Sequence, residues 1–142
     1  SSSDIVITED DIENIKRAKA AIFAATSVLV RETDLGFSDI KKIFIAGGFG
    51  TYINIENAVS IGLFPDIERK RFIFVGNSSL AGACQVLLSY QAMEEVKEVA
   101  KKVTYLELSI ESAYMDEYMA AMFFPHTDSS RFINVDLAKG GY

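Results

Sequence analysis

The spacing of apolar residues near the start of the chain predicts a long helix. Thr8 and Asp11 have the spacing of a helix-capping pair, and the acidic first turn suits the positive end of a helix dipole. Apolar residues then recur at steps of three and four, and Gly36 provides a stop. This recurrence places one set of side chains on one helix face: Ile12, Ile15, Ala18, Ile22, Ala25 and Leu29.

Two short apolar runs further along the chain predict buried β-strands. Residues 42–46 end abruptly in a glycine turn at residues 47–50, and residues 71–75 run directly into Gly76. Asn77 then stands as a candidate cap for a helix of small residues. The order of strand, glycine and helix therefore occurs twice.

The remaining segments continue the alternation of helices and strands. We expect a short helix at 55–61, a charged helix at 91–102, a third strand at 103–108, and an amphipathic helix at 111–124 ended by Pro125. Such alternation favours crossover connections between strands. The sequence thus predicts an α/β fold with a mostly parallel sheet of few strands and helices packed on it.

The boundaries of the folded part can also be predicted. We expect a linker at residues 1–7, one lobe at residues 8–125 and a C-terminal tail at residues 126–142. The tail is polar apart from one apolar cluster at residues 132–135. This cluster either docks as a strand or stays mobile, and the sequence leaves both alternatives open.

Composition and charge narrow the classes of partner. The chain has 142 residues with a net charge of -6, which gives no general attraction to nucleic-acid backbones or anionic lipids. No apolar run approaches the ~20 residues of a membrane span. The single cysteine, Cys84, excludes an intramolecular disulfide and a complete iron–sulfur cluster within this segment. We therefore expect a cytoplasmic protein that binds neither nucleic acid nor membranes.

Both glycine turns follow strands, where ligands of open α/β sheets bind. Gly47, Gly48 and Gly50 lack a Cβ atom, so a ligand can approach their backbone closely. Plain tight-turn geometry explains the same glycines equally well. The spacing matches neither the Rossmann fingerprint nor the P-loop.

A longer stretch carries a more specific resemblance. Residues 43–54, IFIAGGFGTYIN, resemble the adenosine motif of the acetate and sugar kinase, Hsp70 and actin superfamily. With Ala58 and IGLFP at 61–65, the stretch is similar to one family, the reductive activators of corrinoid proteins that serve methyltransferases. Further agreement lies in AKAAI at 18–22, VGNSSLAGA at 75–83, YLEL at 105–108, DEY at 116–118 and FFP at 123–125.

The resemblance implies a partial RNase H-like, actin-like ATPase lobe at the C-terminal end of a longer protein. Such activators use ATP, with Mg, to drive an electron onto a Co(II) corrinoid protein and restore Co(I). Their iron–sulfur cluster is expected in an upstream domain. The superfamily's phosphate-binding hairpins are absent from this chain, so the resemblance gives this chain the adenosine side of a nucleotide site and makes ATP hydrolysis by this chain alone doubtful.

The resemblance also suggests candidate site residues. Gly47, Gly48 and Gly50 would line the adenosine site, and Phe49 could cover the base. Asn77 could hydrogen-bond the ribose or base, or simply cap a helix. Lys19 lies on a helix that borders the adenine pocket in the superfamily, or is a solvated lysine with its aliphatic stem on the helix.

Other reactive residues have plainer interpretations. We expect Cys84 to be buried and inert and His126 to lie in a surface loop. No residue is assigned a catalytic or metal-binding role. Packing is expected for the aromatic set Tyr114, Tyr118, Phe123 and Phe124, and solvation for the carboxylates Asp34, Asp39, Asp66, Asp116 and Glu117.

Two other functions remain open from the sequence. The lobe could be a non-catalytic module that docks the corrinoid partner or pairs in a homodimer, with the glycine turns serving geometry alone. A small-molecule kinase lobe would share the fold, but it needs a catalytic aspartate and phosphate hairpins that we do not find in this chain.

Overall fold

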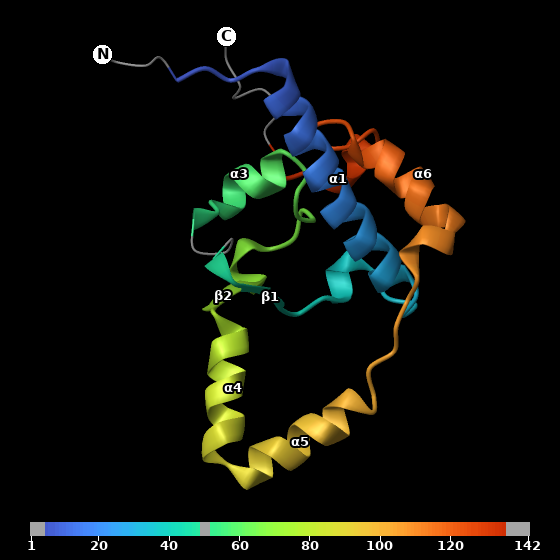
Figure 1. Cartoon of the computed structure of the whole chain (residues 1–142). Coiled ribbons are helices and arrows are strands. Elements are labelled where there is room, and N and C mark those ends of the chain that lie inside the picture. The colour runs from blue at the N-terminus through green and yellow to red at the C-terminus, as the bar shows by residue number, and fades with distance from the viewer. Residues whose placement is uncertain (1–4, 49–51, 136–142) are drawn as a thin grey trace. The chain divides into compact units, whose positions relative to one another are not determined.

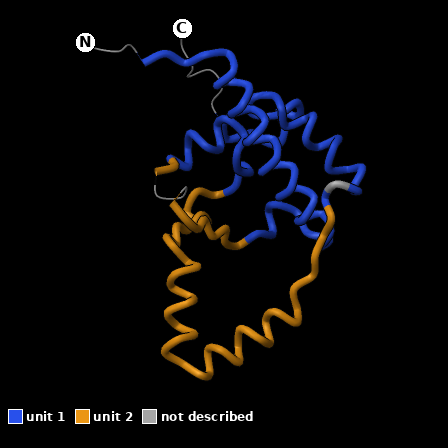
Figure 2. Tube along the Cα trace, viewed as in Figure 1, with its two compact units in different colours: residues 1–40, 54–67, 108–142 blue, residues 41–53, 68–107 orange. Residues whose placement is uncertain are grey.

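The computed structural model describes residues 5–48 and 52–135. Two compact units are distinguished: Ser1–Ile40, Asn54–Ile67 and Leu108–Tyr142 form unit 1, and Lys41–Ile53 with Glu68–Glu107 form unit 2 (Figure 2). The mixture of helices with a small parallel sheet confirms the predicted α/β class. Within the described residues, no helix is both long enough and apolar enough to cross a membrane.

Unit 1 is built around two packed helices. Helix α1 (Glu9–Arg31) runs alongside α6 (Ser112–Ala121), and the short helix α3 (Ile55–Ser60) belongs to the same unit (Figure 1). The predicted cap of α1 is confirmed, because Thr8 Oγ1 accepts from the Asp11 amide at 3.2 Å and Asp11 Oδ2 accepts from the Thr8 amide at 2.9 Å.

The buried face of α1 differs from the face that the aliphatic spacing marks. Ala20, Phe23, Ala24 and Val28 are at most 1% exposed, whereas the aliphatic side chains of the other face lie open within the described residues. Small residues at 20 and 24 allow a neighbouring segment to approach the helix closely, which the larger aliphatic side chains do not. The open positions are Ile12, Ile15, Ile22 and Leu29, between 37% and 50% exposed.

An aromatic cluster joins the C-terminal segment to α1. The ring centroid of Phe23 lies 6.0 Å from that of Phe37 and 5.5 Å from that of Phe132. Phe132 is 2% exposed and ends a short 3-10 helix, η4 (Ser129–Phe132). The sequence left open whether the cluster at residues 132–135 docks as a strand or stays mobile. In the structure Phe132 is docked, but as part of a 3-10 helical turn rather than a strand.

Unit 2 consists of a two-stranded parallel sheet and a helical hairpin. Strands β1 (Ile43–Ala46) and β2 (Phe72–Gly76) pair with Ile43 opposite Phe72, and the register shifts between Ile45 and Ala46 (Figure 1). Helices α4 (Ser78–Leu88) and α5 (Tyr90–Ala100) follow and pack on each other. The first two predicted strands and the two helices predicted after the second strand are thus confirmed.

The predicted third strand is wrong. Residues 103–107 adopt no regular structure, and a 3-10 turn follows at Leu108–Ile110. A β-prone run becomes a strand only when a neighbouring strand accepts its backbone hydrogen bonds. Among the described residues, β1 and β2 pair with each other and give this run no such partner.

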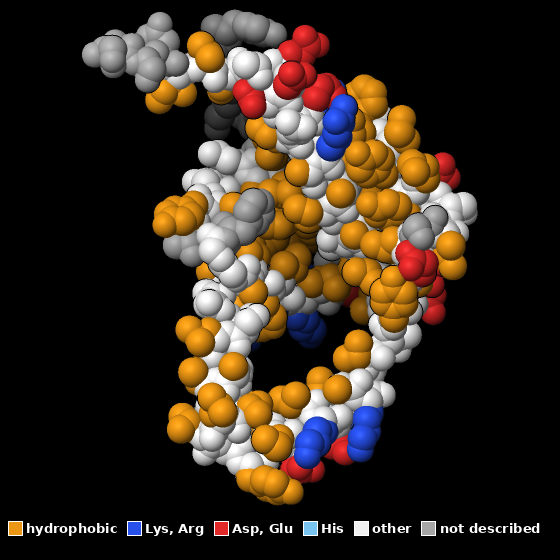
Figure 3. All heavy atoms as spheres, viewed as in Figure 1, with side chains coloured by type: hydrophobic (Ala, Val, Ile, Leu, Met, Phe, Trp, Pro, Cys, Tyr) orange, Lys and Arg blue, Asp and Glu red, His pale blue; other side chains and the backbone are white. Residues whose placement is uncertain are grey.

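The helical hairpin of unit 2 buries no residue within the described structure. Cys84 on α4 is exposed, so the prediction of a buried thiol is wrong. Apolar neighbours in the sequence suggested burial, but the hairpin presents these neighbours to solvent as well: Leu87 and Leu88 are 84% and 88% exposed. Hydrophobic side chains are visible on the surface along α4, α5 and α6 (Figure 3).

Candidate functional site

The two glycine turns meet at the carboxyl ends of the parallel strands. The Gly47 amide donates to the Gly76 carbonyl at 2.7 Å, and both glycines have positive φ, 82° and 63°. A side chain at either position would strain the backbone, so the turn geometry itself requires glycine there. The structure therefore brings together the two segments that the sequence nominates separately.

Unlike Gly47, Gly48 is not required to be glycine by its backbone conformation. Its φ lies outside the left-handed region, and no described atom lies within 4 Å of the position that a Cβ would occupy. Neither backbone strain nor crowding by described residues therefore requires glycine at this position. Phe49 and Gly50, the other two candidates of this turn, lie outside the described residues.

Asn77 caps the helix that follows the second turn. Its Oδ1 accepts from the Leu80 amide at 3.0 Å, which confirms the capping interpretation. The cap uses the oxygen of the side chain and not its amide nitrogen. The residue is exposed at the carboxyl end of β2, beside the glycine turn.

Lys19 lies in unit 1 and is buried, so the interpretation as a solvated lysine is wrong. Its side chain is 1% exposed, and its Nζ donates to the carbonyl oxygens of Phe123 at 2.5 Å and Pro125 at 2.7 Å. The ammonium also lies 5.3 Å from the ring centroid of Phe124. Burial lowers the pKa of Lys19 to about 8, while the carbonyl acceptors favour its charged form.

Gly62, like Lys19, lies close to the Pro125 carbonyl in the turn after α6. This glycine has a φ of 75°, and a Cβ at this position would lie 2.0 Å from the Pro125 carbonyl oxygen. The glycine therefore serves both a left-handed backbone and a close approach. Two segments distant in sequence, at Lys19 and at Gly62, thus approach the Pro125 carbonyl.

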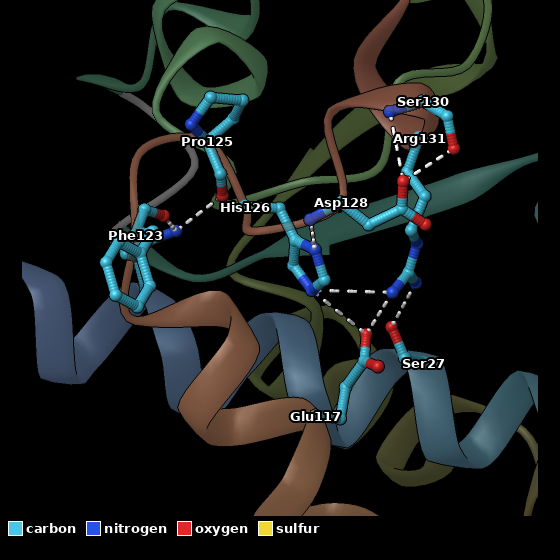
Figure 4. Close-up of polar contacts among 9 residues, drawn as sticks. Ser27, Glu117, Phe123, Pro125, His126, Asp128, Ser130 and Arg131 are labelled. Carbon is cyan, nitrogen blue, oxygen red and sulfur yellow. Dashed lines mark hydrogen bonds and ion pairs between the residues drawn. The ribbon is translucent and has the colours of Figure 1, made fainter.

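A polar cluster around the buried His126, beside this turn, was not predicted from the sequence. His126 is 7% exposed, so its assignment to a surface loop is wrong. Arg131 Nη1 pairs with Glu117 Oε1 at 2.5 Å, and Arg131 Nη2 donates to Ser27 Oγ at 3.1 Å (Figure 4). Ser27 lies on α1, Glu117 on α6 and Arg131 on η4. Because 104 residues separate Arg131 from Ser27, no local sequence pattern could have indicated this contact.

Several predictions for carboxylates and aromatic residues also change. Glu117 is half-buried in its ion pair with Arg131, and Asp66 accepts from the Asn134 amide at 2.7 Å, so neither is simply solvated. Tyr114 and Tyr118 are half-buried with ring centroids 6.2 Å apart, as packing predicts. Phe123 and Phe124 are 60% and 47% exposed, so packing is wrong for these two rings within the described structure.

Metal ligation finds no support in the part of the chain that the structure describes. No group of three or more His, Cys, Asp or Glu side chains there is placed to hold a metal ion. A groove between α4 and α5, lined by Val86, Val96 and Val99 among others, contains none of the candidate site residues. The glycine turns thus remain the feature to compare with known proteins.

Known proteins match the chain over most of its length. Residues 1–136 match a family described as the C-terminal domain of RACo, the ASKHA domain. The chain is 35% identical over 121 residues to the corrinoid activation enzyme RamQ of Eubacterium limosum, which covers 85% of this chain and 20% of that protein. It is 31% identical over 122 residues to a Co(II) methylated amine-specific corrinoid protein reductase of Methanosarcina barkeri, covering 84% of this chain and 22% of that protein.

A solved structure agrees in fold and in sequence. The chain superposes with a TM-score of 0.86 and 55% identity on a reductive activator for corrinoid, iron–sulfur protein, covering 93% of this chain and 21% of that chain. All three relatives are therefore several times longer than the segment that they share with this chain. Because the family model matches residues 1–136 and the solved structure agrees in sequence and fold over 93% of the chain, the chain belongs to the family of C-terminal ASKHA domains of RACo.

Proposed function

We propose that this chain is the C-terminal lobe of an ATP-dependent iron–sulfur protein that reduces Co(II) corrinoid proteins to Co(I) for methyl transfer. Its own contribution is the adenosine side of the nucleotide site. The observation that carries the proposal is the pairing of Gly47 with Gly76 at the carboxyl ends of β1 and β2. The relatives' names, which refer to corrinoid activation and reduction, support the wider activity.

The open position at Gly48 supports close approach of a ligand to the backbone. Neither strain nor contact with described atoms requires glycine there, and a planar purine or ribose needs the space that a side chain would fill. We assign Gly47, Gly48 and Gly50 to the adenosine contact and Phe49 to the face of the base. The amide nitrogen of Asn77 is the proposed donor to ribose or base, because its oxygen already caps α4.

Lys19 has a different role in this proposal. Its ammonium is engaged by the Phe123 and Pro125 carbonyls of unit 1, so we assign it to holding that turn rather than to direct contact with adenosine. The phosphate groups and Mg require ligands from elsewhere in a longer protein, as does the iron–sulfur cluster. Hydrolysis of ATP to ADP and phosphate would supply the free energy that drives the electron onto the corrinoid.

A docking module is the alternative that a specific observation favours. Large apolar side chains on α4, α5 and α6 are exposed within the described residues, among them Leu87, Leu88 and Met119 at 84%, 88% and 59%. Such surfaces are typical of interfaces. They would suit the corrinoid partner, a second copy of the chain, or the rest of a longer protein.

Reduction of the corrinoid tests the proposal directly. In the full-length protein with a reductant, we expect Co(I) to accumulate in the visible spectrum only when ATP is present. Gly48→Val should slow this reaction strongly, since valine fills the open position without straining the backbone. Gly82→Val is the matched control, because Gly82 also has open space around its Cβ position but lies within α4. Equal rates for both variants would favour the docking module.

A further inference from the structure

His126 packs between two aromatic rings where the C-terminal segment contacts α1. Its ring centroid lies 5.4 Å from that of Phe23 on α1 and 6.3 Å from that of Phe132 on η4. The residue is 7% exposed, and Figure 4 shows its imidazole between the Asp128 amide on one side and Glu117 with Arg131 on the other. Any change in its charge therefore takes place inside packed structure.

The hydrogen bonds of the imidazole define its protonation state. The Asp128 amide donates to Nδ1 at 3.0 Å, and a backbone N–H can only donate, so Nδ1 carries a lone pair. A neutral ring must then hold its proton on Nε2. This nitrogen lies 3.6 Å from Glu117 Oε1 and 3.4 Å from Arg131 Nη1, so its proton faces the carboxylate. The Asp128 amide thus selects the neutral tautomer with its proton on Nε2, because a proton on Nδ1 would face this N–H donor.

The charged groups around His126 come from every element packed on it. Burial lowers the pKa of His126 most, and the cations Arg131 on η4 and Lys19 on α1 lower it further. Glu117 on α6 and Asp128 in the turn oppose these effects and raise the pKa. Glu117 is already paired with Arg131 at 2.5 Å, so its charge is shared with a cation before His126 is protonated.

We propose that His126 is an acid-sensitive latch, which fastens the C-terminal segment of residues 126–135 to α1 and α6 while neutral and releases it when Nδ1 takes up a proton. Protonation removes the acceptor of the Asp128 amide and places a second cation 3.4 Å from Arg131. The Arg131 bond to Ser27 and the burial of Phe132 between α1 and the segment are the contacts that opening would break. The direction is fixed: the latch is closed at neutral pH and opens in acid.

The tautomer can be measured without any substitution. The chain contains one histidine, so its imidazole signals in an NMR spectrum are assigned at once. Long-range proton–nitrogen spectra should show the Nε2–H form at pH 7.5 and a pKa below the ordinary 6.5. A Nδ1–H tautomer, or a pKa at or above the ordinary value, would overturn the proposal.

Opening of the segment requires a second measurement, amide hydrogen exchange corrected for the intrinsic effect of pH. Between pH 7.5 and 5, protection of the Asp128 and Val135 amides should fall, by up to about tenfold for each unit by which the pKa of His126 is lowered. The Ile61 amide, bonded to the Asn57 carbonyl in α3, is the internal reference and should change less. Equal loss at all three amides would indicate general acid unfolding and contradict a local latch.

His126→Asn is the matched variant. Asparagine Oδ1 stands near the place of Nδ1 and can accept from the amide two residues on, but it does not titrate in this range. The variant should hold the segment with little change in protection between pH 7.5 and 5. A variant that still opens in acid would contradict the proposal. If the variant does not fold, the tautomer and exchange measurements on the unsubstituted chain decide the question.

Discussion

The ammonium of Lys19 bonds to the carbonyl oxygen of Pro125 at 2.7 Å, across 106 residues of chain. The same ammonium bonds to the Phe123 carbonyl, so one side chain of α1 satisfies two acceptors of the turn that ends α6. A buried ammonium with two carbonyl acceptors is a structural element rather than a surface charge. Lys19 therefore ties the first helix of unit 1 to the last.

Removing this ammonium should destabilise unit 1. Lys19→Met keeps most of the aliphatic volume but leaves two carbonyl groups without their donor, and we expect a loss of about 1–3 kcal/mol in the free energy of unfolding. Urea denaturation followed by circular dichroism measures it. Lys16→Met is the control, since Lys16 pairs with Glu13 at a partly exposed position of the same helix. Equal losses in the two variants would contradict the structural role of Lys19.

The same lysine predicts how stability depends on pH above neutrality. Burial lowers its pKa from 10.5 to about 8 in the folded chain, so the unfolded chain binds more protons between these two values. The free energy of unfolding should therefore gain an increment from Lys19 as pH rises from about 8 to 10.5, and this increment should be lost as pH falls back towards 8, while the hydrogen bonds of the ammonium remain at neutral pH. Comparing Lys19→Met with the parent chain at several pH values isolates this slope. A difference between the two chains that is independent of pH would contradict the shift.

Gly62 should tolerate no side chain. An alanine Cβ would lie 2.0 Å from the Pro125 carbonyl oxygen, and the φ of 75° disfavours any L-residue. Gly62→Ala should cost more than about 1 kcal/mol in unfolding free energy. Gly82→Ala within α4 should be neutral or stabilising by up to about 1 kcal/mol, because its Cβ position is open. A neutral Gly62→Ala would contradict the close approach of Gly62 to the Pro125 carbonyl.

Glu117→Gln should affect both Arg131 and His126. The substitution keeps the shape of the side chain but removes the charge that pairs with Arg131 and that raises the pKa of His126. We expect the pKa of His126 to fall further, followed through its imidazole signals by NMR. Asp116→Asn on the exposed side of the same helix is the control and should leave that pKa nearly unchanged. A rise after Glu117→Gln would contradict the arrangement.

Local patterns predicted the parts of the fold that depend on local interactions. The cap at Thr8 and the first two strands with the glycines that follow them were predicted correctly, because each is set by residues within a few positions of one another. Capping by Asn77 was one of two interpretations that the sequence left open, and the structure shows the cap. The family was also recognised from sequence, through the spacing of several motifs around the glycine turns rather than one short motif.

The errors share a different physical origin. His126, Lys19 and Glu117 were misassigned because their burial depends on packing against partners that lie up to 106 residues away along the chain. The third strand and the buried Cys84 were predicted from apolar runs alone, which do not reveal whether a neighbouring strand or surface is present to receive them. Long-range partners therefore set the limit of prediction in this chain.

Nucleotide binding by the longer protein that contains this chain tests the central claim most directly. Titration calorimetry with ATP and ADP should detect binding to the unsubstituted protein and to Gly82→Val. Gly48→Val should bind at least about tenfold more weakly, a loss of about 1.4 kcal/mol or more in binding free energy. Unchanged affinity of Gly48→Val would contradict the assignment of the glycine turns to adenosine.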